Sequence, residues 1–230
     1  MPSVKAREDF SLPGESVSLN LLDRLVWQFR GRVPVDDHLG SVCASLVMSS
    51  GNLHDMTAYQ LIQVQEVLGA AAQPRTALVE SATEKLRLAY LDKIKSNSLT
   101  FAWAPLAWRQ DFDITLSAVK HHGNLLQYAP VDLKDNAVVV TAAVKNAAEA
   151  IQYASARLQD HEGIASLAVS GFGPTLFYLS ARLKDTPAVV RLAIQENGMA
   201  LQHASDRLRR DPQLIRLAIA QNPRAARFVL

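Results

Sequence analysis

The residues whose types could perform nucleophilic chemistry lie in the first quarter of the chain. Cys43 is the only cysteine, and His38 and His54 flank it. A thiolate paired with a histidine could attack a carbonyl carbon, with Asp36 or Asp55 orienting the imidazole. A lone cysteine is, however, commonly a small buried hydrophobe. We therefore expect no catalytic site, and cysteine-dependent activity around Cys43 is the alternative.

The histidines offer no metal site. His121 and His122 are adjacent, so on a helix their side chains point about 100° apart and cannot readily share one ion. We expect neither a metal nor a cofactor.

Basic side chains recur at fixed spacing in the second half of the chain. One column holds Arg157, Arg182 and Arg207, and the column two residues further on holds Lys134, Lys184 and Arg209. In a stack of repeats they would form a basic ridge that docks an acidic protein, a phospholipid headgroup or a nucleic-acid backbone. The other interpretation, which we favour, is ion pairing with an acidic column: Asp135, Asp160, Asp185 and Asp211.

Amide and aromatic side chains also recur. The glutamines could line an inner groove and bind the backbone of a peptide, or they could simply be solvated; they are Gln127, Gln152 and Gln202. Trp103 and Trp108 could anchor a partner. Both align with columns of apolar residues, Trp103 with Tyr128 and Trp108 with Leu133, so we favour core packing for the tryptophans and for the tyrosine column.

All these candidates must be positioned by a repeat. The alanine column that sets its period is Ala118, Ala143, Ala168, Ala193 and Ala218, and the aromatic column is Tyr128, Tyr153, Tyr178, His203 and Phe228. Five copies spaced 25 residues apart without an insertion indicate one unit repeated in tandem.

Each copy predicts two helices. The longer begins near an N-cap residue or a first-turn proline, as at Asp211-Pro212, and carries one apolar stripe. We expect Gly123, Gly173 and Gly198 to end it. The shorter helix carries the Leu-x-Tyr-Ala pattern. No copy can cover its own apolar face, so successive copies must stack. The predicted fold is all-α, an α-solenoid of 25-residue helical-hairpin repeats preceded by a small helical cluster.

The cluster is predicted from apolar residues at three-and-four spacing. The expected segments are Val17–Arg30, Leu39–Met48, Met56–Leu68 and Arg75–Ile94. Ser81 to Glu84 resembles a capping box inside the last segment. We predict a flexible terminus over 1–15, the helical cluster over 16–95 and the repeats over 96–230, continuous with the cluster.

Composition sets broad limits. The 230 residues are 49% apolar and 20% charged, which is ordinary for a globular protein. A net charge of +2 is too small to indicate nucleic acid or a membrane by itself. The start lacks a secretory apolar core, no apolar run is long enough to span a membrane, and the single cysteine fits a reducing compartment. We expect a cytoplasmic protein.

The repeat pattern resembles a known family. Residues 148–169 and 198–219 share the order Ala-Leu-Gln-Tyr-Ala-Ser, leucine, aspartate, Val-Val and Ala-Val, with substitutions. This order is similar to the bacterial helical-repeat family catalogued as domain of unknown function forty-one sixteen, over about residues 112–230. The resemblance implies a protein-interaction module, with a bacterial secreted effector exported without a cleavable signal as one setting. It transfers no catalytic residue.

The predicted function is therefore a non-enzymatic helical-repeat scaffold that binds a protein partner. An effector with a weak enzymatic site in the amino-terminal helices is one alternative, and a nucleic-acid-binding solenoid that uses the basic ridge is another. Since the last copy leaves Phe228 and Val229 without a following repeat, self-association through that face is a further prediction.

Overall fold

The computed structural model describes residues 37–50, 53–70 and 77–230. All regular structure within these ranges is helical, which confirms the predicted all-α class. The chain divides into two compact units, Met1–Lys93 and Ile94–Leu230. The predicted flexible terminus over 1–15 and the helix expected over Val17–Arg30 lie outside the described residues.

The first unit contains three of the four predicted helical segments, with small shifts at their ends. The helices are α2 (Asp37–Ser49), the 3₁₀ turn η1 (Leu53–Asp55), α3 (Ala58–Ala70) and α4 (Ala77–Ser96), the last of which continues into the second unit. Ser81 to Glu84 lies inside α4, where the Thr83 hydroxyl donates to the Val79 carbonyl oxygen at 2.8 Å instead of capping a helix. The carboxyl end of α2 is held by Lys85, whose Nζ donates to the carbonyl oxygens of Val47 and Ser50 at 2.9 and 2.6 Å.

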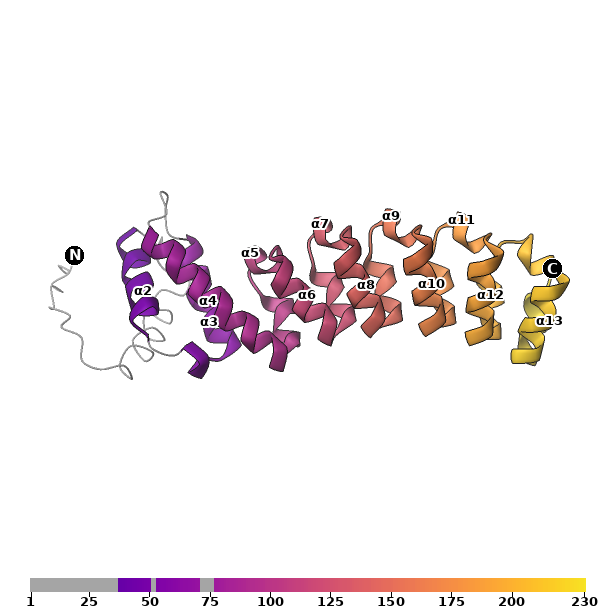
Figure 1. The fold of residues 1–230 in the computed structure, drawn as a ribbon, viewed down its shortest axis with the longest axis horizontal. Helices are drawn as coiled ribbons and strands as arrows, with labels where there is room; N and C mark the ends of the chain where they lie inside the picture. The colour runs from indigo at the N-terminus through magenta and orange to yellow at the C-terminus, as the bar shows by residue number, and fades with distance from the viewer. Residues whose placement is uncertain (1–36, 51–52, 71–76) are drawn as a thin grey trace, which may run out of the picture. The chain divides into compact units, whose positions relative to one another are not determined.

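The second unit is the repeat. Its long helices have ten residues each and lie side by side in sequence order (Figure 1); they are α6 (Phe112–His121), α8 (Ala137–Asn146), α10 (Glu162–Gly171), α12 (Pro187–Glu196) and α13 (Pro212–Gln221). The five are spaced 25 residues apart from Phe112 to Pro212. Stacking of successive copies buries the apolar stripe of each one.

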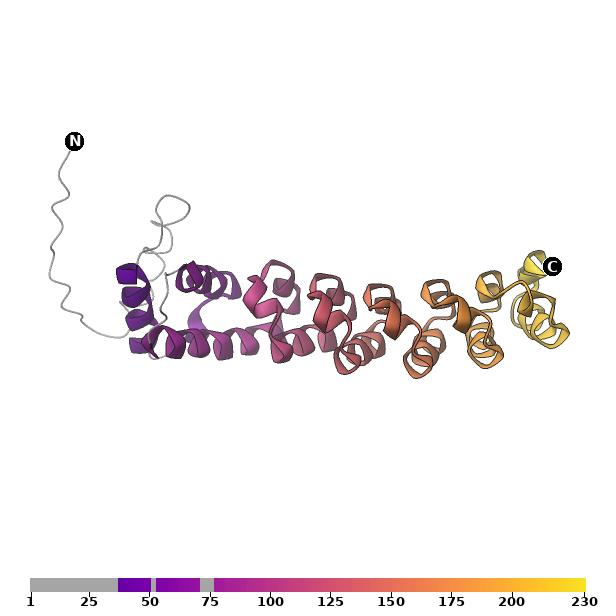
Figure 2. The ribbon, with the colours of Figure 1, turned by 90° about the horizontal axis from the view of Figure 1, so that it is seen from above.

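Each copy differs from the predicted hairpin in one respect, because two short segments follow the long helix. The first is a six-residue 3₁₀ helix: η2 (Ser98–Trp103), η3 (Gly123–Tyr128), η4 (Ala148–Tyr153), η5 (Gly173–Tyr178), η6 (Gly198–His203) and η8 (Pro223–Phe228). The second is a single turn: α5 (Leu106–Arg109), α7 (Val131–Lys134), α9 (Ala156–Gln159), α11 (Ala181–Lys184) and η7 (Leu208–Arg210). Figure 2 shows the long helices in one row and the short segments in the other.

Four of the five long helices begin at a side chain that accepts a backbone hydrogen bond, whereas the N-cap Thr186 of α12 makes no such bond. The Asp111 carboxylate accepts from the Ile114 N–H at 2.9 Å, and the Asn136 side chain accepts from two backbone N–H groups of α8. At His161 the imidazole Nδ1 takes this role, accepting from the Ile164 N–H at 3.3 Å. These caps satisfy N–H groups that have no partner inside the helix.

The predicted alanine column lies at the centre of the apolar seam, and all five of its side chains are fully buried. The glycines, by contrast, do not end the long helices as predicted, because each begins the following 3₁₀ helix. A Cβ on Gly123 would lie 2.2 Å from the carbonyl oxygen of Ala143 in the next copy, and one on Gly173 would lie 2.4 Å from that of Ala193. These glycines therefore allow neighbouring copies to pack closely.

Candidate functional site

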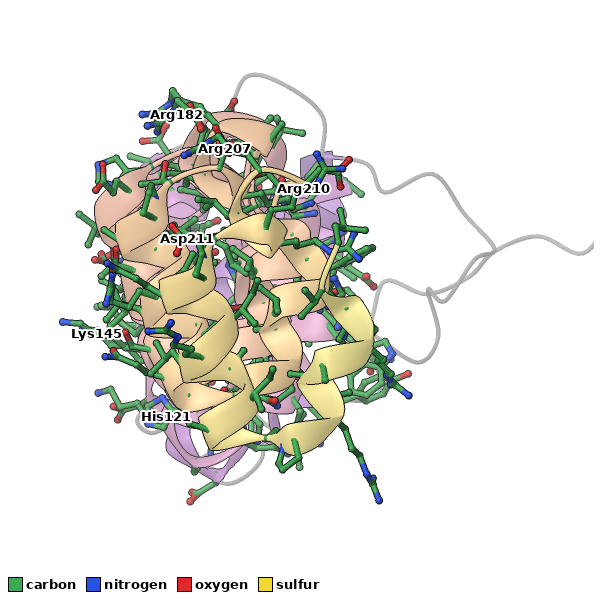
Figure 3. The ribbon with its side chains drawn as sticks, turned by 90° about the vertical axis from the view of Figure 1, so that its right-hand side faces the viewer. His121, Lys145, Arg182, Arg207, Arg210 and Asp211 are labelled. Atoms are coloured by element: carbon green, nitrogen blue, oxygen red, sulfur yellow. The ribbon has the colours of Figure 1, made fainter. Side chains whose placement is uncertain are left out.

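The arginines of the first basic column are engaged between copies. Nε of Arg157, Arg182 and Arg207 lies 3.0 Å from a carboxylate oxygen of the aspartate 22 residues earlier, which is Asp135, Asp160 or Asp185. The Nη2 atom also donates to the backbone oxygen of that aspartate, at 2.6–2.7 Å. Figure 3 places Arg182 and Arg207 along one edge of the stack. Ion pairing therefore occupies these guanidinium groups.

A serine completes each of these contacts, and the three-residue set repeats three times. The hydroxyls of Ser155, Ser180 and Ser205 donate to the same aspartates and also accept from the N–H groups of Leu158, Leu183 and Leu208. The serine bond is the largest influence on the pKa of each aspartate, and together with the arginine it holds that pKa below the ordinary value. We call the set the Asp–Ser–Arg ladder.

The second basic column is not a uniform ridge. The ammonium of Lys184 lies 5.4 Å from the centroid of the Phe177 ring, and burial lowers the pKa of this lysine. Arg209 donates from Nε to the Phe228 carbonyl oxygen at 2.8 Å. Lys134 is half-buried, and its carbonyl oxygen accepts from the Ser155 N–H at 2.9 Å. Two of these side chains therefore contribute to packing, and partner binding by this column stays a prediction.

The glutamine column faces solvent in part. Gln127 and Gln202 are exposed, whereas Gln152 is half-buried and its backbone oxygen accepts from the Gln159 amide at 3.2 Å. In the third copy Phe177 replaces the glutamine and is 57% exposed, and the centroid of its ring lies 5.3 Å from those of both Tyr178 and His203.

The aromatic column is not core, contrary to expectation. Tyr128 is 38% exposed, while Tyr153 and Tyr178 are half-buried at the margin of the apolar seam. The two tryptophans separate: Trp108 is buried as predicted, but Trp103 is 73% exposed. Core packing is therefore correct for Trp108 and wrong for Trp103.

Trp103 is one of four exposed apolar side chains on η2, α5, η3 and α7 whose exposure was not predicted from the sequence. Leu106 is 56% exposed and Val131 is 77% exposed. Trp103 and Leu106 correspond, 25 residues later, to Tyr128 and Val131 in the adjoining copy. Position 131 could have signalled this surface, because the later copies carry Ala156, Ala181 and Asp206 there. We call Trp103, Leu106, Tyr128 and Val131 the apolar surface.

Cys43 lies in the core of the first unit. Its side chain is 1% exposed, and burial raises the pKa of the thiol to about 11. Such a thiol is protonated at neutral pH and is a poor nucleophile. The side chains of His38, His54 and Asp36 lie outside the described residues, whereas Asp55 is exposed.

The described part of the chain contains no cluster of side chains suited to a metal ion, and no helix in it could cross a bilayer. The adjacent histidines instead make separate hydrogen bonds. His121 Nδ1 lies 2.8 Å from the Ser117 carbonyl oxygen, and His122 Nδ1 lies 2.6 Å from the Ser98 hydroxyl.

One apolar column of the last copy is less covered than in the copies before it, although Leu214 and Ala218 are buried. Ile219 is 36% exposed, whereas its counterparts Val144, Val169 and Ile194 are buried under the copy that follows each of them. Self-association through this face stays a prediction.

Comparison with known proteins supports the repeat assignment. Residues 111–159 and 187–229 match the family described as Domain of unknown function (DUF4116). No curated protein and no solved structure matches the chain.

Proposed function

Because this chain carries repeats of the DUF4116 family of unknown function, we propose that it is a non-enzymatic scaffold that binds a protein partner. The observation that carries the proposal is the apolar surface, where Trp103 is 73% exposed and Val131 is 77% exposed. Tryptophan is enriched among the residues that dominate protein interfaces, and apolar side chains gathered on a surface mark such interfaces.

The chemistry of the surface favours a protein over a nucleic acid. The ladder arginines are paired with aspartates through the contacts described above. A phosphate backbone would have to compete with those carboxylates. An apolar protein segment would gain from covering Trp103 and Val131 without breaking any ion pair.

The proposal is tested by capture of partners on immobilised protein followed by mass spectrometry. We expect a partner that binds the native chain and is lost when Trp103→Glu is combined with Val131→Glu. The control is Leu88→Glu, because Leu88 is 54% exposed on α4 and is not one of the four residues of the apolar surface. If no partner distinguishes the double variant from the control, the surface is not a docking site.

The effector setting is a prediction from the family resemblance. It is checked by fusing the chain to a translocation reporter and following its appearance in host cells. Retention of the reporter in the producing cell, under conditions where a known effector is exported, would contradict it.

A further inference from the structure

A second surface lies on the row of long helices, between α6 and α8. It is a groove of about 680 Å³. Leu116, Val138 and Ala142 form apolar walls, while Lys120, Lys145 and Asn146 line the same groove. Val138 is 59% exposed there. We call it the α6–α8 groove.

The charge of the groove is one-sided. Lys120 and Lys145 lie in the last turns of α6 and α8, and no acidic side chain is among the residues that line it. In the described residues neither ammonium forms an ion pair, in contrast to the ladder arginines. Lys145 and His121 lie on the same side of the stack in Figure 3. Two cationic side chains without an ion-pair partner among the described residues therefore lie at one end of the α6–α8 groove.

The lysine pair of the groove is particular to the first two full copies. The column of Lys120 and Lys145 continues as Ser170, Gln195 and Ala220. A row of cations along the whole stack would suit a phosphate backbone. A cationic end that is confined to one apolar groove suits a short segment with a carboxylate end and an apolar face.

We propose that the α6–α8 groove binds an acidic amphipathic helix of a partner protein, with the acidic first turn of that helix between Lys120 and Lys145. The long helices have ten residues, about 15 Å, so the groove accepts about three helical turns. An apolar stripe that lies in a groove between two helices is a common mode of recognition.

The dipoles of the helices set the orientation. The carboxyl ends of α6 and α8 lie at the lysine end of the groove and carry partial negative charge. A partner helix that runs antiparallel to them places its positive amino end there, and its acidic first turn meets the lysines. A parallel partner would oppose like dipole ends, so the antiparallel arrangement is favoured. This inference rests on the proposed scaffold function and names the partner class.

The probe is a fluorescein-labelled peptide of about fourteen residues, with Asp and Glu in its first turn, leucines at helical spacing and glutamines elsewhere. Fluorescence anisotropy should show binding to the full chain. A peptide of the same composition, with the acids in its last turn, should bind several-fold more weakly. Val138→Gln should also weaken binding several-fold, because it removes apolar contact from a position that is already exposed.

The charge variant is Lys120→Glu with Lys145→Glu, which should weaken binding at least tenfold. Its matched control is Arg191→Glu with Arg216→Glu, which makes the same change in net charge on exposed positions of α12 and α13 that do not line the groove. The control should change the affinity less than twofold. Equal losses in the two double variants would overturn the proposal, because they would indicate general electrostatic attraction.

Three other outcomes would also overturn it: no peptide binding at about 1 mM, equal binding of the two peptides, or preferential binding of an oligonucleotide or of phosphatidylserine vesicles. The scaffold function is judged separately. If Trp103→Glu with Val131→Glu loses a captured partner while the peptide does not bind, the groove proposal fails and the scaffold stands. If the peptide binds while no captured partner depends on Trp103, the proposal for the apolar surface is wrong and the groove proposal is retained.

Discussion

Ala148 packs against Gly171 across the joint between two copies, and a Cβ built on Gly171 would come within 3.2 Å of the Cβ of Ala148. At the equivalent positions of the other joints the glycine comes first in the chain. A residue 23 positions later then accepts a hydrogen bond from the glycine N–H through its side chain. The pairs are Gly123 with Asn146, Gly173 with Glu196 and Gly198 with Gln221. Each joint therefore has either a methyl facing a glycine or a glycine facing a polar acceptor.

Gly123→Ala should destabilise the repeats. The added Cβ would lie 2.2 Å from the Ala143 carbonyl oxygen, and this backbone atom can move only if the next copy moves with it. We expect a loss of about 1–3 kcal/mol in the free energy of unfolding, measured by urea titration of the circular dichroism. Gly69→Ala is the control, because nothing lies within 4 Å of the added atom. It should be neutral or should stabilise α3 by up to about 1 kcal/mol.

Exchanging the pair at the exceptional joint should show coupling. Ala148→Gly alone removes a methyl that packs on Gly171, and Gly171→Asn alone places a side chain against that methyl. The double variant reproduces the combination of Gly123 and Asn146, in which the glycine N–H donates at 2.7 Å. In a double-mutant cycle, we expect the double variant to be more stable than the summed effects of the single variants predict. The difference in the free energy of unfolding should be about 0.5–3 kcal/mol. Additivity within about 0.5 kcal/mol would mean that the two positions do not depend on each other.

The Asp–Ser–Arg ladder should make stability depend on acid pH. The Ser180 hydroxyl, and to a lesser degree Arg182, holds the pKa of Asp160 below its ordinary value of 3.8. A lowered folded-state pKa gives a stabilisation that is fully present above pH 3.8 and is lost as the pH falls through the lowered pKa. Asp160→Asn should therefore be less stable than the native chain at neutral pH, and the difference in stability should narrow as the pH falls below 3.8.

The control for the ladder is Asp132→Asn, on an exposed aspartate in the first turn of α7 that has no serine or arginine partner of this kind. Its urea midpoint should stay close to that of the native chain, because the substitution removes none of the ladder contacts. If the difference in stability between Asp160→Asn and the native chain stays constant with pH, the Asp160 carboxylate makes no pH-dependent contribution to stability.

The period, the alanine column and the caps at Asn136 and Asp211 could be predicted from the sequence because their causes lie within one copy. Apolar spacing fixes the buried stripe, and an aspartate or asparagine before it marks the start. The function of the glycines could not be predicted in this way. Position 123 requires a glycine because the carbonyl oxygen of Ala143, in the next copy, lies too close for a Cβ atom. Only the stacked structure brings these two residues together.

The 3₁₀ character of the second helix and the exposure of Trp103 also escaped prediction. Hydrogen bonds to the third rather than the fourth residue leave little trace in a six-residue apolar pattern. Alignment with Tyr128 placed Trp103 in an apolar column, but that column runs along the margin of the seam, where Tyr128 is itself 38% exposed. The spacing of residues shows which positions are equivalent; it does not show how far each lies from solvent.

The nucleic-acid alternative predicts steep salt dependence. Since each ladder guanidinium is already paired with an aspartate, we expect no oligonucleotide binding that depends on Arg157, Arg182 and Arg207. A dissociation constant that weakens about 10³- to 10⁵-fold between roughly 50 and 200 mM salt would contradict this expectation. To count against the expectation, that binding must also be lost in the triple alanine variant, whose folding is checked by circular dichroism.

The enzymatic alternative depends on the reactivity of Cys43. Burial raises the pKa of its thiol from 9.0 to about 11, so iodoacetamide at pH 8 should label the unfolded chain in urea far faster than the folded chain. A raised folded-state pKa means that the folded chain holds the proton more tightly, so the stability that this thiol contributes is lost as the pH rises above 9. Cys43→Ala should fold, at a cost of roughly 1 kcal/mol. Rapid alkylation of the native protein, together with an activity that folded Cys43→Ala lacks, would favour an enzyme instead.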